Sequence, residues 1–241
     1  MGADQHIDWA SAAASALEWW QDAGVDTLVD EAPRNWLAPP EARPVVAAPA
    51  AGVDPVPAAL PATLTEFEAW RIGADAPDAG WGVPIAPQGA AASGLMIVVD
   101  MPERDDGRAG TLLSGDVGRL FDRMLAAIGC DRQSVYLASL AVARPASGRI
   151  APEMTAPLAD LARHHVALVR PRRLLVMGDA ANRVLLGTSA AASPPLLHVF
   201  KHDAGQTGAV ATFHPRFLLD QPAQKARAWR DLQMLIEGMG A

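Results

Sequence analysis

His214 is the residue whose type and setting best suit chemistry at neutral pH. It follows the strand-like run 208–213 and precedes Pro215, which fixes its own φ and biases the residue before it toward extended backbone. An imidazole can donate or accept a proton near pH 7. We therefore expect His214 to project from a stiff backbone at the end of a strand, into any site that this strand end forms.

The elements that position His214 follow an alternating pattern after residue 95. Short apolar or β-branched runs predict strands at 95–101, 134–142, 172–178 and 208–213. Amphipathic segments predict helices at 115–129, 157–171, 179–187 and 222–239, after an earlier helix capped by Thr63 or Thr65. This alternation predicts an α/β fold, a three-layer α/β/α sandwich around a mostly parallel four-stranded sheet.

Ligands of such sheets bind at the carboxyl ends of the strands. The segments expected there are 100–106, 139–145, 178–181 and 214–216, which places His214 in a common crevice with Asp100. Asp105 and Asp106 also lie in this group. We interpret them as a solvated acidic pair, because no third ligand for a metal ion is evident.

The sequence before this domain differs in composition. Residues 1–37 predict a helical segment with four of the seven tryptophans, residues 38–62 form a Pro/Ala-rich linker, and residues 63–241 form the domain. Two interpretations of the tryptophans stay open. They pack back onto the domain, or they form a docking peptide for a protein partner, because tryptophan is a favoured anchor at interfaces.

Composition narrows the classes of protein further. No apolar run reaches the roughly 20 residues needed to span a bilayer, and the first residues do not resemble a secretion signal, so we expect no membrane and a cytoplasmic location. With Cys130 as the single cysteine, we expect no cofactor bound through several cysteines, including an iron–sulfur cluster. Residues 1–140 have 8 basic and 20 acidic side chains, whereas residues 141–241 have 12 and 7. Two interpretations of this asymmetry stay open: one face of the protein binds a polyanion, or the surface is solvated with a weak local bias in charge.

Three segments resemble the uracil-DNA glycosylase superfamily, most closely its iron–sulfur, thermophile-type branch. They are LMIVVDMPERDDGRAGTLLSGDVGRLFDRMLAAIG and the residues after it to 145, RPRRLLVMGDAANRVLLG, and TFHPRFLLDQPAQKARAWRDLQML. The resemblance implies DNA repair by base excision, with DNA as a partner. The branch's cluster cysteines have no counterparts here, and Ala143 stands in one of their places.

The resemblance also implies roles for individual residues. In that branch a Gly-Glu-Ala-Pro-Gly loop contacts the flipped nucleotide and helps to position the hydrolytic water. Asp100, Met101 and Pro102 occupy its centre here, while both glycines are replaced, by Val99 and Glu103. His214 corresponds to the histidine that stabilises the leaving base.

Two further base-pocket positions carry different side chains in this sequence. Leu113 corresponds to the phenylalanine that stacks on uracil, and Ser139 to the asparagine that reads the pyrimidine edge. The expected pocket thus comprises Met101, Pro102, Leu113 and Ser139. A serine makes fewer hydrogen bonds than an amide, so usual uracil specificity is not expected.

Basic residues near the crevice are candidates for the DNA backbone, namely Arg144, Arg149, Arg216 and Lys201. Lys201 lies in the segment 198–208, which corresponds to a loop near DNA in the resembled branch.

Two functions follow from these observations. The first is a divergent DNA glycosylase, a hydrolase in which Asp100 positions water and His214 stabilises the departing base. The second is a catalytically inactive scaffold of replication or repair. It is similar in layout to the psi subunit of bacterial clamp loaders, whose related domain follows a tethered, tryptophan-bearing peptide.

Overall fold

The computed structural model describes residues 60–189 and 196–237, together with Ser15. Apart from Ser15, the expected tryptophan-rich segment 1–37 and residues 38–59 of the expected linker lie outside the described residues. The described residues from 60 onward belong to one compact unit, Ala51–Ala241. None of the helices described from residue 60 onward has the length and apolar composition of a membrane-spanning segment.

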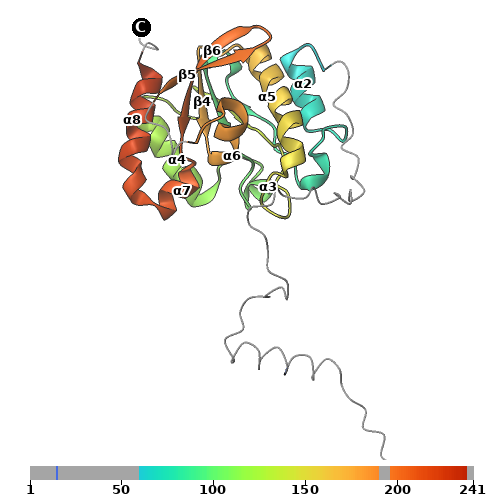
Figure 1. The fold of residues 1–241 in the computed structure, drawn as a ribbon, viewed down its shortest axis with the longest axis horizontal. Coiled ribbons are helices and arrows are strands. Elements are labelled where there is room, and N and C mark those ends of the chain that lie inside the picture. Colours follow the sequence, from blue (N-terminus) through green and yellow to red (C-terminus); the bar gives the residue numbers. More distant parts are fainter. Residues whose placement is uncertain (1–14, 16–59, 190–195, 238–241) are drawn as a thin grey trace, which may run out of the picture. The chain divides into compact units, whose positions relative to one another are not determined.

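A six-stranded sheet forms the centre of this unit, in the order β1-β3-β2-β4-β6-β5. Strands β4, β6 and β5 are labelled in Figure 1. Its four inner strands are parallel and correspond to the four expected ones: β3 (Tyr136–Ser139), β2 (Leu95–Val99), β4 (Arg173–Met177) and β6 (Gly205–Thr212). All five residues of β2 are buried, as its continuous apolar run predicts for a parallel sheet covered on both faces.

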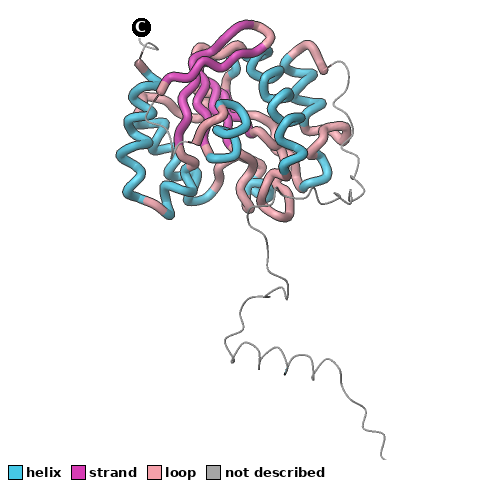
Figure 2. The backbone as a smooth tube through the Cα atoms, viewed as in Figure 1, coloured by secondary structure: helices cyan, strands magenta, loops and turns pink. Residues whose placement is uncertain are grey.

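Helices cover both faces of the sheet, so the expected α/β three-layer architecture is confirmed (Figure 2). Met96 and Val98 of β2 pack in one apolar cluster with α2 (Leu64–Arg71) and α5 (Thr155–Val169). Leu95 and Ile97 pack in a second cluster with α4 (Gly115–Ala127) and α8 (Lys225–Ile236). This alternation follows from the two-residue period of a strand.

Both edge strands are additions to the expected four-stranded sheet. β1 (Gln88–Gly89) and β5 (Leu197–His202) pair antiparallel with β3 and β6. β1 is too short to give a sequence pattern. The segment 198–208, expected to be a loop near DNA, instead forms most of the hairpin between β5 and β6.

The last part of the domain contains one more helix than expected. α7 (Pro215–Asp220) begins directly after His214, and the turn Pro222–Gln224 then leads into α8. Pro215 occupies the first helical position, where its missing N–H costs nothing. The proline interpreted as a stiff mount for His214 therefore also starts a helix. The remaining elements are α3 (Asp106–Ala109), the short α6 (Asp179–Ala181) with the π-turn Asn182–Leu186, and the 3₁₀ turns Ala79–Trp81, Ala91–Ser93 and Pro152–Met154.

A buried ion pair fixes the chain after β3. Arg71 of α2 pairs with Asp78 and donates from Nη2 to the carbonyl of Leu140 at 3.0 Å, while Asp78 accepts from the N–H of Val142 at 2.8 Å. Because both charges are buried and hydrogen-bonded, they hold the segment that leads to Arg144 in one place.

Candidate active site

A cavity of about 620 Å³ lies at the carboxyl ends of the parallel strands. All four strand ends contribute to its lining: Asp100 after β2, Arg144 beyond β3, Gly178 after β4 and His214 after β6. Its volume falls within the range of about 300–1,000 Å³ that is usual for small-molecule sites. The topology therefore brings the two expected catalytic residues to one cavity.

Asp100 is held by the first turn of α6. Its Oδ1 accepts a hydrogen bond of 2.6 Å from the N–H of Ala181. Gly178 makes this approach possible, because a Cβ at that position would lie 2.5 Å from the carboxylate and the backbone there has a φ of +111°. The conformation of Gly178 and the position of Asp100 thus depend on each other.

Burial is the main influence on the protonation of Asp100. It raises the pKa of this carboxyl to about 6, against the hydrogen bonds from Ala181 and Ala180, which lower it. Neighbouring Asp179 raises the pKa and Arg183 lowers it. A carboxylate with a pKa close to neutrality is suited to take a proton from water.

His214 is the N-cap of α7, and its side chain is 12 % exposed. Its Nδ1 accepts a hydrogen bond of 3.2 Å from the N–H of Arg216, so the proton of the neutral ring is assigned to Nε2. Burial lowers the pKa of His214 to about 4, with Asp106 raising it and Arg144 lowering it. At neutral pH the residue is therefore an uncharged donor through Nε2–H.

Glu103 forms a buried ion pair beside His214. Arg216 donates from Nε to Oε1 of Glu103 at 3.0 Å, and the same oxygen lies 3.7 Å from Nδ1 of His214. Glu103 is only 7 % exposed, so Arg216 compensates a buried carboxylate. The guanidinium of Arg216, a candidate for a DNA phosphate, is directed to Glu103 in this structure.

The model of the family described as "Uracil DNA glycosylase superfamily" matches residues 86–233, more than half of the chain. The chain belongs to the uracil DNA glycosylase superfamily. This membership relates it to DNA repair and to proteins that act on DNA.

Two curated relatives place it near one branch of the superfamily. The chain is 27 % identical over 153 residues to a type-4 uracil-DNA glycosylase of Pyrobaculum aerophilum. The aligned region covers 60 % of this chain and 78 % of the relative. It is 23 % identical over 153 residues to a type-4 uracil-DNA glycosylase of Archaeoglobus fulgidus, covering 61 % and 77 %.

Leu113 does not line the cavity of this superfamily member. It is fully buried, packs in the cluster beneath α4, and has a φ of +54°, which is unusual for a residue with a side chain. Its N–H donates to Asp106 at 2.8 Å, and its carbonyl accepts from Nη2 of Arg132 at 2.7 Å. These bonds turn the side chain into the core.

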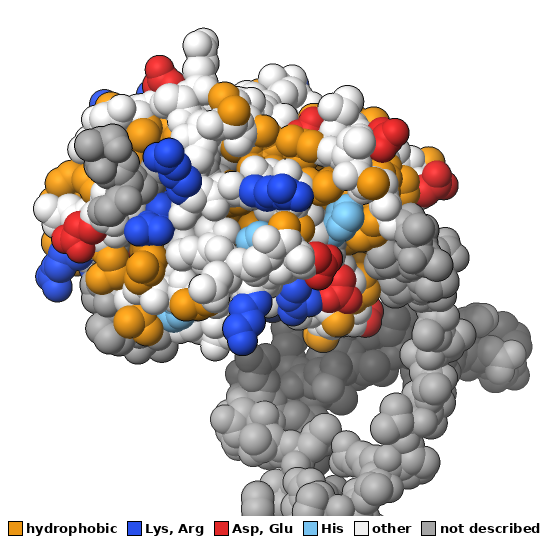
Figure 3. All heavy atoms as spheres, turned by 90° about the horizontal axis from the view of Figure 1, so that it is seen from above, with side chains coloured by type: hydrophobic (Ala, Val, Ile, Leu, Met, Phe, Trp, Pro, Cys, Tyr) orange, Lys and Arg blue, Asp and Glu red, His pale blue; other side chains and the backbone are white. Residues whose placement is uncertain are grey.

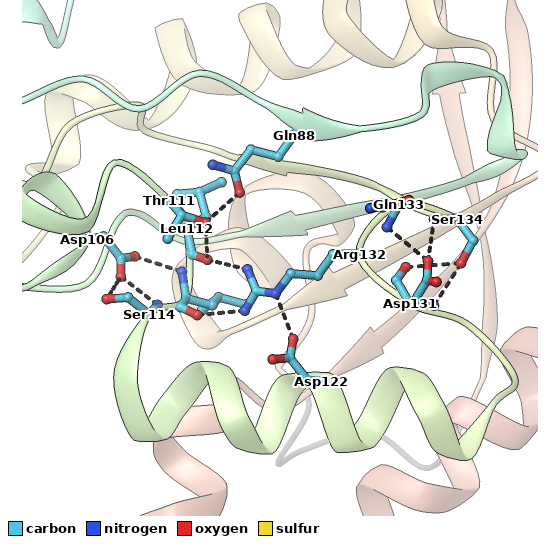
Figure 4. Close-up of polar contacts among 11 residues, drawn as sticks. Gln88, Asp106, Thr111, Leu112, Ser114, Asp122, Asp131, Arg132, Gln133 and Ser134 are labelled. Atoms are coloured by element: carbon cyan, nitrogen blue, oxygen red, sulfur yellow. Dashed lines mark hydrogen bonds and ion pairs between the residues drawn. The ribbon is translucent and has the colours of Figure 1, made fainter.

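Asp106 and Arg132 organise the whole loop before α4 (Figure 4). Asp106 is fully buried and accepts from the N–H groups of Glu103, Leu113 and Ser114 at 2.7–2.8 Å, and from the Ser114 hydroxyl at 2.5 Å. Its interpretation as half of a solvated pair is therefore wrong. Arg132 donates to Leu112 and Leu113 and pairs with Asp122 at 2.6 Å.

The other three expected pocket residues differ in position. Met101 lines the cavity. Pro102 is buried and does not line the cavity, and its carbonyl accepts a hydrogen bond from Arg144 Nη1 at 3.1 Å. Ser139 does not line it either. Its hydroxyl oxygen is buried without a hydrogen-bond partner in the described part of the chain, beside a void of about 10 Å³ that is barely the size of one water.

The basic candidates are spread over different parts of the molecule. Arg144 and Arg216 line the cavity, whereas Arg149 is exposed and does not. Lys201 pairs in register with Gln206, six residues from Thr212 at the cavity end of β6, a separation of roughly 20 Å at about 3.4 Å per residue. It therefore belongs to the opposite end of the sheet, which is turned toward the viewer in Figure 3.

The residues present do not fit an iron–sulfur cluster held by four thiolates. Cys130 is the single cysteine of the sequence, and Ala143, which stands in one of the expected cluster positions, is fully buried. Within the described ranges no three His, Cys, Asp or Glu side chains are grouped as a metal site.

Two cavity residues were not singled out from the sequence. Phe213 and Phe217 line the same cavity as Asp100 and His214. Their spacing of four residues, around the start of a helix, could have indicated that the two rings pack together, because side chains at i and i+4 can meet.

Proposed function

We propose that this protein is a DNA glycosylase that hydrolyses the N-glycosidic bond of an altered base. The observation that supports it is the convergence of Asp100 and His214 on one cavity in complementary protonation states. At neutral pH the carboxylate of Asp100 is mostly ionised, and His214 is neutral with a proton on Nε2. The first can accept a proton, and the second can donate a hydrogen bond.

The reaction follows from these two states. The nucleotide rotates out of the stack so that its base enters the cavity. The Asp100 carboxylate orients a water and takes its proton as the water oxygen bonds to C1′ of the sugar. The electron pair of the breaking C1′–N bond leaves with the base, which is stabilised by the Nε2–H of His214 and is then protonated by solvent. Asp100 returns the proton that it took from the water to solvent. The negative charge of Asp100 also favours the positive charge that develops on the sugar.

Base selection differs in this proposal from the expectation based on the superfamily. Leu113 and Ser139 stand where the resemblance places the stacking and edge-reading groups, and neither lines the cavity. A site built to hydrogen-bond a base rejects analogues by about 10⁴-fold, and such discrimination is lost with its polar groups. We therefore propose a substrate other than uracil, or slow release of uracil.

The non-catalytic scaffold is the second candidate. The position of Leu113 and Ser139 outside the cavity favours it. In that case the fold is retained while base recognition has been lost, since a fold does not by itself determine a function. The two candidates differ in one measurable property, the release of free base.

The test is base release from oligonucleotides that carry uracil, hypoxanthine, xanthine or only normal bases, in single- and double-stranded form. We expect release from at least one altered base, and its loss in His214→Ala. Arg163→Ala is the matched control, because Arg163 pairs with Asp160 on the exposed face of α5 and does not line the cavity. If the wild-type protein releases no base above the His214→Ala level, the scaffold is the better account.

A further inference from the structure

An aromatic pair forms one wall of the cavity. Phe213 follows β6 and Phe217 lies in the first turn of α7, and both line the cavity. Their ring centroids are 5.2 Å apart and their planes differ by 16°, so the rings are stacked. The backbone that presents His214 therefore also presents two parallel aromatic rings.

The two rings have different surroundings. Phe213 is 6 % exposed, packs against Leu218 and Ala228, and has the guanidinium of Arg227 5.6 Å from its ring centroid. Phe217 is 40 % exposed. Phe213 is thus the anchored inner ring, and Phe217 is the accessible outer ring, supported by Phe213 on one face.

The charges around the cavity indicate which part of a ligand could meet this wall. The charged side chains in the lining are Asp100, Glu103, Asp179, Asp220, Arg144 and Arg216. Glu103 already neutralises Arg216, and Asp179 pairs with Arg183 at 2.8 Å. The charged side chains that remain are Asp100, Asp220 and Arg144, and their net negative charge disfavours a phosphate. The stacked aromatic wall suits a flat, uncharged group. In DNA the flat, uncharged group is the nucleobase. The cavity volume of about 620 Å³ has room for a purine, because it lies within the range of sites that hold drug-sized ligands.

We propose that Phe217 is the surface on which an unpaired base stacks in this cavity. This inference rests on the proposed function, in that the cavity is taken to receive a base from DNA. It assigns to α7 the stacking that Leu113 cannot provide, because the Leu113 side chain is held in the core by Asp106 and Arg132. Stacking on an aromatic side chain contributes about 1–3 kcal/mol per base to single-strand binding. It accepts different bases, because every base has a flat π-face.

The experiment uses the full chain and a single-stranded oligonucleotide with one central 2-aminopurine. Stacking on an aromatic ring quenches the fluorescence of this base, while the anisotropy of a labelled oligonucleotide gives the affinity. For the wild-type protein we expect binding accompanied by quenching. For Phe217→Ala we expect affinity to fall by about 5- to 150-fold, the range for loss of one base–aromatic stack, and quenching to be lost.

Three further variants separate stacking from other effects. Phe217→Tyr keeps an aromatic face and should bind and quench like the wild type, whereas Phe217→Leu keeps apolar volume and should not quench. Leu219→Ala is the matched control, because Leu219 is 39 % exposed on the same helix and does not line the cavity. Melting temperatures of all variants establish that they are folded.

The outcomes distinguish this inference from the proposed function. If the wild type binds and quenches, and Phe217→Ala and Phe217→Leu do the same, Phe217 is not the stacking surface and the proposed function is unaffected. If the wild type binds no oligonucleotide, the proposed function fails, and the inference fails with it.

Discussion

Replacing Asp100 by asparagine removes one buried charge from the cavity while keeping the size of the side chain. The oxygen of asparagine can still accept the hydrogen bond from Ala181, which is 2.6 Å long in the wild type. The pKa of Asp100 rises from 3.8 to about 6 on folding, mainly because burial disfavours the charged form. That rise corresponds to about 3 kcal/mol between the ionised and protonated forms.

The sign of the effect on stability follows from the direction of this change. Because the folded pKa lies above the unfolded value, the folded state binds the proton more tightly. The stability that the folded state gains by binding this proton more tightly is fully present below pH 3.8 and is lost as the pH rises through about 6. At pH 8 the folded wild type therefore bears the full cost of about 3 kcal/mol for keeping Asp100 ionised and buried, whereas Asp100→Asn has no charge at this position.

We expect Asp100→Asn to increase the free energy of unfolding at pH 8 by about 2 kcal/mol, since asparagine loses part of the hydrogen bonding from Ala180 and Ala181. For a domain of this size that is roughly 4–8 °C in melting temperature. At pH 4.5 Asp100 of the folded wild type is mostly protonated, and the penalty falls to about 1 kcal/mol. The gain should then shrink to about zero, because the lost hydrogen bonding offsets what remains of the penalty. His214 and the buried His165 of α5 also have shifted pKa values, but they titrate in both proteins and so largely cancel.

Urea unfolding of both proteins at the two pH values measures this difference. A variant that is less stable than the wild type at pH 8, or a gain that is the same at pH 4.5 and pH 8, would refute the reasoning. Stabilisation together with loss of base release would show that the buried charge is retained for function at a cost in stability.

The remaining predictions concern the loop and the pH profile. Asp106→Asn should destabilise the domain by about 2–5 kcal/mol in urea unfolding, because an amide cannot accept hydrogen bonds from all the N–H groups around it. The matched control is Asp105→Asn, since Asp105 is exposed. It should change stability by less than about 0.5 kcal/mol. The rate of base release should rise with pH up to about 6, as Asp100 ionises, and then level off, because His214, with a pKa of about 4, is already neutral. A rate that falls between pH 5 and pH 7 would contradict these assignments.

The sequence predicts the central part of the fold well, because the information there is local. Each of the four inner strands is a short apolar run, and the helices between them have the spacing of one buried face. Since carboxyl ends of parallel strands meet at one edge, the sequence also brings Asp100 and His214 to one crevice.

Features that depend on distant contacts could not be predicted in this way. Leu113 corresponds in sequence to a stacking residue, but its orientation is set by Asp106, seven positions before it, and Arg132, nineteen positions after it. Glu103 stands where the resembled loop has a glycine, and its pairing with Arg216 spans 113 positions. The hairpin of β5 was missed because its pairing with β6 gives half-exposed residues no strong apolar pattern.

The central claim is that Asp100 and His214 act together on a base in one cavity, and single-turnover base release tests it most directly. On the best substrate of the oligonucleotide panel, we expect Asp100→Asn and His214→Ala each to lower the rate by about 10²- to 10⁴-fold while the proteins stay folded. Release at the wild-type rate by either variant, or no release by the wild type on any substrate, would contradict the account.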